Sequence, residues 1–167
     1  MTYIPALRRL IVLPLLFITY IGVAQNSKSP ITGYDLMIER KNITSSKVAR
    51  YSPLFPHAVI ADKFIFVSGM PGYDPVSGKI VSDDLEAQTR QCYLNIKIVL
   101  EEAGGDLSKI VKITQFVVAG GDMSVVNKVF KEFFPDIASA PARSSPMVMP
   151  FPAGTGILIS VECTALR

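Results

Sequence analysis

Hydrophobic and polar positions along the chain alternate with a period that changes several times between two and about 3.6 residues. Period-two patterns and short apolar runs predict strands at residues 36–43, 57–61, 63–70, 110–118, 144–149 and 157–166. The run from Phe64 to Val67 is continuously apolar, which is typical of a strand covered on both faces. Prolines at 53 and 56 separate the first predicted strand from the second, and turn residues at 71–79 end the third.

Two segments have the spacing of amphipathic helices. The first begins at Asp83, which makes a capping-box-like start with Glu86, and it ends at Gly104-Gly105. The second is capped by Asp122 and stopped by Pro135. The apolar face of the first helix comprises Leu85, Thr89, Cys92, Tyr93, Ile96, Val99 and Leu100, and that of the second comprises Val126, Val129, Phe130, Phe133 and Phe134. We expect both faces to enter the core.

The predicted element order is therefore β-β-β-α-β-α-β-β, an α+β arrangement. Two helical crossovers imply parallel pairings within a mixed β-sheet and place both helices on one face of it. Phe66 and several strand valines and isoleucines belong to the other face. An apolar face that one subunit leaves uncovered would indicate self-association.

Residues 1–24 have the pattern of a signal peptide. Arg8 and Arg9 form a positive n-region, residues 10–21 form an apolar core, and Gly22-Val23-Ala24 offers a cleavage site before Gln25. The alternative is an uncleaved membrane anchor, but the apolar core is shorter than the roughly 20 residues of a spanning helix. We therefore expect export to the periplasm or the exterior, a flexible lead-in at 25–35 and one domain at 36–167, with no membrane contact after cleavage.

Composition excludes several classes of site. The formal net charge is +3, and it falls to +1 without Arg8 and Arg9, too little for a general nucleic-acid surface. The single histidine, His57, cannot form a metal site alone, and we expect neither a metal nor a cofactor. Cys92 and Cys163 fall on apolar faces, which favours two reduced core residues over the disulfide that export would permit.

The chemistry centres on Pro141-Ala142-Arg143-Ser144-Ser145, at the entrance to a predicted strand. A guanidinium keeps its charge and offers a planar fork of donors, so Arg143 needs an anionic partner such as a carboxylate. From this pentapeptide alone, a structural ion pair or an exposed charge explains the arginine as well as a ligand does.

An ordered set of motifs extends the argument: Ser68-Gly69, Leu85-Glu86-Ala87-Gln88-Thr89-Arg90-Gln91, Leu94-Asn95-Ile96, Glu102-Ala103-Gly104-Gly105, Val126-Asn127, Pro-Ala-Arg-Ser and Val161-Glu162-Cys163-Thr164-Ala165. From Asn42 to the C-terminus the chain resembles the RidA family of enamine/imine deaminases, also called YjgF or L-PSP endoribonucleases. The resemblance implies a chorismate-mutase-like fold, a homotrimer, and ligand clefts between subunits.

It also implies that Arg143 binds the carboxylate of a small 2-imino acid while water attacks the C=N carbon, releasing ammonia and a 2-keto acid. Ser68 matches a strand-end serine that could bind ligand or water, or only its own backbone. Asn127 matches an asparagine that could tie a loop instead of touching the substrate.

Three positions depart from the family pattern. Phe55 stands where many members have a tyrosine, and Ser145 stands where a cysteine commonly follows Arg-Ser. Ser160 takes the place of the glutamate thought to hold the attacking water. Sliding the alignment by two residues would give Glu162 that role, but it worsens the match at residues 163–165, so we interpret Glu162 as structural.

These residues support two principal hypotheses. The first is an exported deaminase acting on a small carboxylate-bearing imine or enamine without a cofactor. The second is a binder of small carboxylates that kept the Arg143 clamp and lost the water-handling group. Ribonuclease activity, the older name for the family, is disfavoured by the near-neutral mature charge and the lack of a histidine-based acid–base pair.

Overall fold

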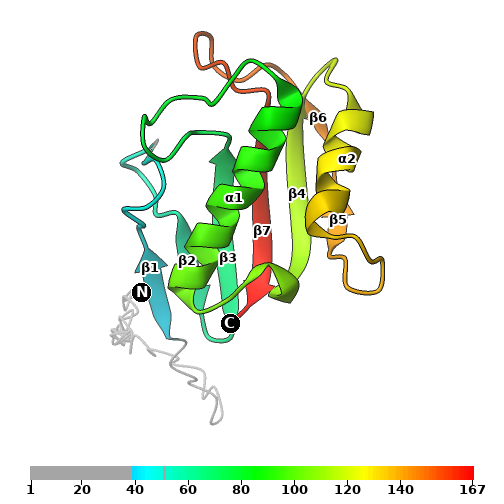
Figure 1. Ribbon diagram of the computed structural model, residues 1–167. Helices are drawn as coiled ribbons and strands as arrows, with labels where there is room; N and C mark the ends of the chain where they lie inside the picture. The colour runs from blue at the N-terminus through cyan, green and yellow to red at the C-terminus, as the bar shows by residue number, and fades with distance from the viewer. Residues whose placement is uncertain (1–38, 51) are drawn as a thin grey trace, which may run out of the picture. The chain divides into compact units, whose positions relative to one another are not determined.

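A mixed β-sheet with two helices on one face forms the structure (Figure 1). A computed structural model describes residues 39–50 and 52–167. The strands are β1 (Arg40–Ile43), β2 (Ala58–Ala61), β3 (Phe64–Pro71), β4 (Ile110–Val118), β5 (Ala142–Ser144), β6 (Met147–Val148) and β7 (Ile159–Leu166). The helices are α1 (Leu85–Ala103), α2 (Met123–Phe133) and the 3-10 turn η1 (Leu107–Lys109). The predicted α+β class is confirmed, and the element order agrees with the prediction except that three strands, not two, follow α2.

The strand order across the sheet is β1-β2-β3-β7-β4-β5, and β6 pairs with β4 beyond the end of β5. The pairs from β1 to β4 are antiparallel, whereas β5 and β6 run parallel to β4. The crossover through α2 therefore joins adjacent parallel strands. The crossover through α1 instead joins β3 to β4, with β7 inserted antiparallel between them.

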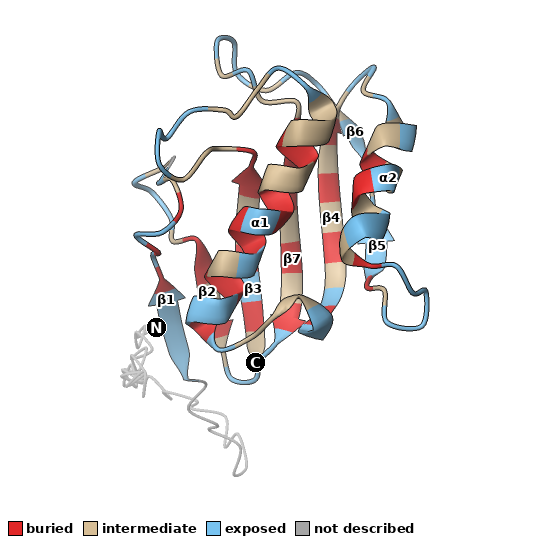
Figure 2. Ribbon diagram, viewed as in Figure 1, coloured by how far each residue is buried: buried red, intermediate tan, exposed pale blue. Residues whose placement is uncertain are grey.

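Alternation along the central strands separates a core face from an open face. On β4, Ile113 and Val117 are buried while Lys112 and Thr114 are only partly covered. Figure 2 shows this alternation on β4 and β7 beneath α1. Phe66 on β3 is 46% exposed in the single chain, so the apolar run 64–67 is not covered on both faces as its sequence suggested. Within the described part of one chain, no other element covers the open face of the sheet at Phe66.

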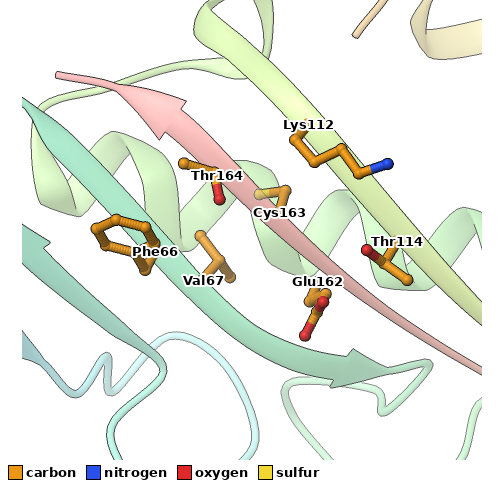
Figure 3. A pocket seen from close by; sticks show the side chains of 7 residues that line it. All are labelled: Phe66, Val67, Lys112, Thr114, Glu162, Cys163 and Thr164. Carbon is orange, nitrogen blue, oxygen red and sulfur yellow. The ribbon is translucent and has the colours of Figure 1, made fainter. Parts of the chain in front are cut away.

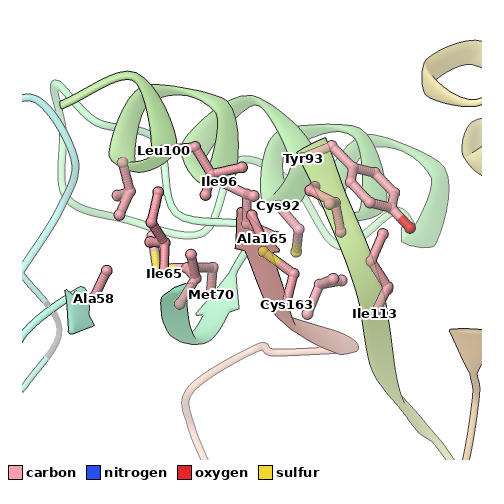
Figure 4. Close-up of a cluster of buried hydrophobic side chains, with 14 of the residues drawn as sticks. Ala58, Ile65, Met70, Cys92, Tyr93, Ile96, Leu100, Ile113, Cys163 and Ala165 are labelled. Carbon is pink, nitrogen blue, oxygen red and sulfur yellow. The ribbon is translucent and has the colours of Figure 1, made fainter. Parts of the chain in front are cut away.

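The core lies between α1 and the sheet (Figure 4). Tyr93, Ile96 and Leu100 of α1 face Ile65 of β3 and Ile113 of β4, all with at most 1% exposure. The cysteines, Cys92 and Cys163, are free and buried, as predicted. Desolvation by burial raises the pKa of Cys163 to about 12, and that of Cys92 also rises, so both stay as uncharged thiols.

Both helix starts and the end of α1 reflect local chemistry, with one correction. The N-cap of α1 is Asp84, whose carboxylate accepts the amide hydrogen of Ala87 at 2.7 Å; the predicted cap at Asp83 is wrong by one residue. Gly104 ends the helix in the left-handed conformation, at φ 86°, which glycine adopts without strain. Asp122 caps α2 as predicted, by accepting from Ser124.

The single strand predicted at 144–149 is wrong. The chain forms two short strands there, β5 and β6, because Pro146 has no amide hydrogen for the ladder and Ser145 turns toward Gln115 instead. The first predicted strand begins at Arg40 within the described residues, and its positions 36–38 lie outside them, as do the signal peptide and the lead-in. No helix of the described chain is long and apolar enough to cross a membrane.

Candidate functional site

Arg143 lies on the edge strand β5 and extends toward the helical side of the sheet. Its Cα pairs in register with Ile113, whose side chain enters the core, so Arg143 emerges on the same face. The guanidinium carbon lies 4.4 Å from the ring centroid of Phe130 on α2, a distance at which a cation is attracted by the aromatic face. The ring thus attracts the guanidinium of Arg143, a residue that is exposed in the single chain.

No carboxylate within residues 39–50 or 52–167 forms an ion pair with Arg143. Glu86 of α1 and Glu132 of α2 already form ion pairs with other cations. Arg90 donates to Glu132 at 2.7 Å and to Glu86 at 2.9 Å, and these bonds lower the pKa of both carboxyl groups. The structural ion pair that the sequence left open for Arg143 is therefore not formed within the described chain.

A hollow of about 410 Å³ adjoins the guanidinium. Its polar lining consists of Asn127, Lys131 and Arg143, and its apolar lining consists of Phe130, Phe134, Pro135, Ile137 and Ala140. The polar side chains stand on one face of α2 and on β5, and the apolar ones continue from the end of α2 into the next loop. This arrangement suits a small anion attached to a short apolar group.

Ser145 is tied to this cluster through a buried network. Its hydroxyl donates to Oε1 of Gln115 at 2.8 Å, and Nε2 of Gln115 donates to the Tyr93 hydroxyl oxygen at 2.7 Å. Tyr93 and Gln115 are both fully buried, and desolvation raises the pKa of Tyr93. Because the hydroxyl of Ser145 is directed inward, the network fixes the backbone that carries Arg143 instead of offering a free hydroxyl.

Asn127 lines the hollow one turn before Lys131. Its Oδ1 atom is buried and has no hydrogen-bond partner in the part of the chain that the structure describes. An unpaired buried acceptor costs about 1–3 kcal/mol, so a donor from a ligand or another chain would stabilise it. The structure therefore brings Arg143 and Asn127 to one hollow, whereas Ser145 does not line it.

The remaining predicted residues form a second group around β3 and β7. The hydroxyl of Ser68 donates to the carbonyl of Pro56 at 2.8 Å, next to Phe55, which is 45% exposed. Ser160 is 7% exposed on β7, and a Cβ added to Gly69 would lie 3.0 Å from its hydroxyl oxygen. Ser160 pairs in register with Phe116, on the open face, and so it does not meet Arg143 within one chain.

Glu162 also faces the open side. It lines a hollow of about 170 Å³ with Lys112 and Thr114 of β4, and Figure 3 shows its side chain between Val67 and Thr114, with Lys112 and Phe66 farther along the strands. Glu162 is absent from the lining of the Arg143 hollow. Neither version of the alignment therefore places a carboxylate at Arg143 within a single chain.

Comparison with known proteins identifies the family. Residues 44–167 match the model described as Endoribonuclease L-PSP. The bovine 2-iminobutanoate/2-iminopropanoate deaminase is 35% identical over 128 residues, covering 77% of this chain and 90% of that protein. The mitochondrial protein mmf1 of Schizosaccharomyces pombe is 37% identical, with 86% and 87% coverage. The chain belongs to the RidA family.

Solved structures of similar proteins have the same fold. YyfA from Yersinia pestis superposes with a TM-score of 0.71 at 30% identity, covering 77% of this chain and all of that one. TdcF of E. coli, solved with bound serine, gives a TM-score of 0.68 at 26% identity, with 76% and 98% coverage. The fold expected from the resemblance is thus confirmed.

Sequence patterns missed three residues of this RidA-family site. Phe130 was assigned only to the core, yet its ring holds the Arg143 guanidinium. Gln115 was interpreted as an alternating strand position, and Lys131 received no role. Helical spacing places Lys131 on the same face as Asn127, four residues earlier, but does not distinguish it from a solvated lysine. In the described chain, no three histidine, cysteine, aspartate or glutamate side chains gather as a metal site would require.

Proposed function

We propose that this RidA-family protein is a deaminase that hydrolyses a small 2-imino carboxylate, or its enamine tautomer, to a 2-keto acid and ammonia. The observation that carries the proposal is Arg143 itself. Its guanidinium rests on Phe130, borders a hollow of about 410 Å³ and has no carboxylate partner in the described chain. The names of the curated relatives support the reaction class.

In this proposal, the Arg143 guanidinium binds the substrate carboxylate through two parallel N–H···O bonds. The bound imine carbon is then held beside a water molecule, and orientation replaces a random encounter. The water oxygen adds to the C=N carbon, and its two protons pass to the nitrogen. The carbon–nitrogen bond then breaks, so one imine and one water give one ketone and one ammonia. The serine bound to TdcF, itself a carboxylate-bearing amino acid, supports ligands of this class.

The cleft proposed for this reaction lies between subunits of a homotrimer. Two observations support it: Arg143 and Ser160 emerge on opposite faces of one chain, and the open face carries the 46% exposed Phe66. A neighbouring copy could place its Phe55, Ser68 and Ser160 opposite Arg143. In such a cleft, Ser160 would hydrogen-bond the attacking water, although a serine cannot act as a carboxylate base.

The test measures keto-acid and ammonia release from imines that an amino-acid oxidase generates in the assay. The purified protein should accelerate release, and Arg143→Ala should lower kcat/KM about 10- to 100-fold, the effect of losing charge-assisted hydrogen bonds of about 1.5–3 kcal/mol. Arg40→Ala is the matched control, because Arg40 is exposed on β1 and does not line the hollow. An unchanged rate for Arg143→Ala would remove the mechanism.

A second candidate is a binding protein without turnover. It is favoured by Ser160 and by the position of Glu162, which lines the open-face hollow and not that of Arg143. Calorimetric titration with 2-oxobutanoate separates the two functions. Saturable binding that depends on Arg143, without any acceleration of imine hydrolysis, would establish the binder and exclude the deaminase.

Ribonuclease activity, which the family name also suggests, has no support at this site. The chain's single histidine, His57, is 3% exposed, and its Nδ1 already accepts the amide hydrogen of Ser45 at 3.0 Å. Export, with a mature chain beginning at Gln25 and free of the membrane, belongs to the proposal on sequence grounds. N-terminal sequencing of protein recovered from outside the cytoplasm tests that part.

A further inference from the structure

Lys131 is a second cation at the hollow that contains Arg143. It lies on α2 one turn after Asn127, directly follows Phe130, and has an exposed side chain. Both cations line the same hollow of about 410 Å³, and its lining contains no aspartate or glutamate. Two positive charges around one small volume repel each other, and an anion bound between them would offset this repulsion by attracting both.

The acidic groups nearest this hollow are engaged elsewhere: Asp136, between the lining residues Pro135 and Ile137, accepts the amide hydrogen of Ala138 at 3.0 Å and does not itself line the hollow. Glu86 and Glu132 neutralise Arg90 and Lys128, with N···O distances of 2.7–3.0 Å. The four groups have no net charge and leave no acid for Lys131. Within the described residues, neither Lys131 nor Arg143 forms an ion pair. The residues that line the hollow therefore carry two positive charges and no negative charge, and a monocarboxylate would neutralise only one of them.

We propose that the preferred ligand of this site is a dicarboxylate, with one carboxylate on Arg143 and the second reaching Lys131. The inference rests on the proposed function and specifies its substrate as a 2-imino dicarboxylate. The apolar lining, from Phe134 to Ala140, would contact the short methylene chain that joins the two carboxylates. Lys131 suits the second role, because a flexible ammonium can adapt to carboxylates at different distances.

The discriminating measurement is calorimetric binding of two keto acids of similar length, 2-oxoglutarate and 2-oxopentanoate. They differ in a terminal carboxylate in place of a methyl group, so their affinity ratio isolates the second charge. The wild-type protein should bind 2-oxoglutarate about fivefold more tightly at low salt, the scale of one partly exposed charge pair. Added salt should shrink this ratio, since the second contact is exposed.

Lys131→Met should reduce the ratio to about one, and Lys131→Arg should restore it. Lys97→Met removes the same charge from an exposed position on α1 that does not line the hollow, and it should leave the ratio unchanged. A wild-type ratio near one, or a ratio that Lys131→Met does not change, would overturn the dicarboxylate inference. In that case, binding of 2-oxopentanoate that disappears in Arg143→Ala would still support the carboxylate clamp. If neither acid binds, both proposals are wrong.

Discussion

The buried bond between Gln115 and Tyr93 links the sheet to α1 and, through Ser145, to the segment that carries Arg143. We predict that Tyr93→Phe destabilises the protein although it removes only one oxygen atom. Both partners are fully buried, and the N···O distance is 2.7 Å. Phenylalanine retains the ring contacts with Phe133 and Phe134, at 4.9 and 5.9 Å between centroids, so packing is largely preserved.

The expected loss comes from the donor left behind. Without the tyrosine oxygen, one N–H of Gln115 is buried without an acceptor, which costs about 1–3 kcal/mol. A value of about 1.5 kcal/mol would lower the Tm by roughly 4–8 °C for a domain of this size. The site should also loosen, because Gln115 would turn toward a new acceptor and release the Ser145 hydroxyl that it now binds at 2.8 Å.

Urea unfolding of the wild type and Tyr93→Phe measures this loss of unfolding free energy. The variant should have a lower urea midpoint, and the dependence of the free energy on urea concentration should be unchanged. A Tyr93→Phe/Gln115→Leu variant should be less destabilised than the sum of its single changes, since it removes both buried polar partners together. A loss below about 0.5 kcal/mol for Tyr93→Phe, or simple additivity in the double variant, would refute the reasoning about an orphaned donor.

Two further predictions concern the cap of α1 and the single histidine. Asp84→Ala should lower the free energy of unfolding by about 1 kcal/mol, while Asp83→Ala should change it little; equal losses in thermal unfolding would contradict the cap assignment. Burial lowers the pKa of His57 below its ordinary 6.5, so the unfolded chain binds more protons below that value. The stability that neutral His57 contributes is therefore present above pH 6.5 and should decline as the pH falls below 6.5, and His57→Gln should remove this decline in urea titrations. A decline of the same size in the variant would assign it to other groups.

Most helices and strands could be predicted from short sequence patterns. The two wrong predictions, the first helix cap and the strand at 144–149, each have a local cause. Gly104 and Asp122 end and begin helices because the left-handed conformation and the N-cap each depend on one residue. Two adjacent aspartates at 83 and 84 made the first cap ambiguous, since either carboxylate could accept a nearby amide. The strand predicted at 144–149 overlooked Pro146, whose missing amide hydrogen outweighed the apolar pattern around it.

The candidate site was only partly accessible to the same reasoning. The family resemblance, and not the motif around Arg143 alone, implied a carboxylate clamp, and the neighbours of Arg143 depend on tertiary contacts that no short pattern encodes. Phe130 has the same helical spacing as the core valines, yet it also faces the guanidinium, because α2 ends over the edge strand. Lys131 resembles any solvated lysine until the hollow and its lack of acidic partners are known.

Sheet register decides what one subunit can do alone. Arg143 shares the register of Ile113 and faces the helices, whereas Ser160 shares that of Phe116 and faces the open side. Side chains alternate strictly between the faces of a strand, so no adjustment of rotamers can bring these two groups together within one chain. In the proposed mechanism, carboxylate binding uses the helical side, whereas water activation uses a group on the other side. A protein that only binds the carboxylate and one that also hydrolyses the imine could therefore have the same contacts around Arg143. They would differ only in the residues that a neighbouring subunit places opposite Arg143.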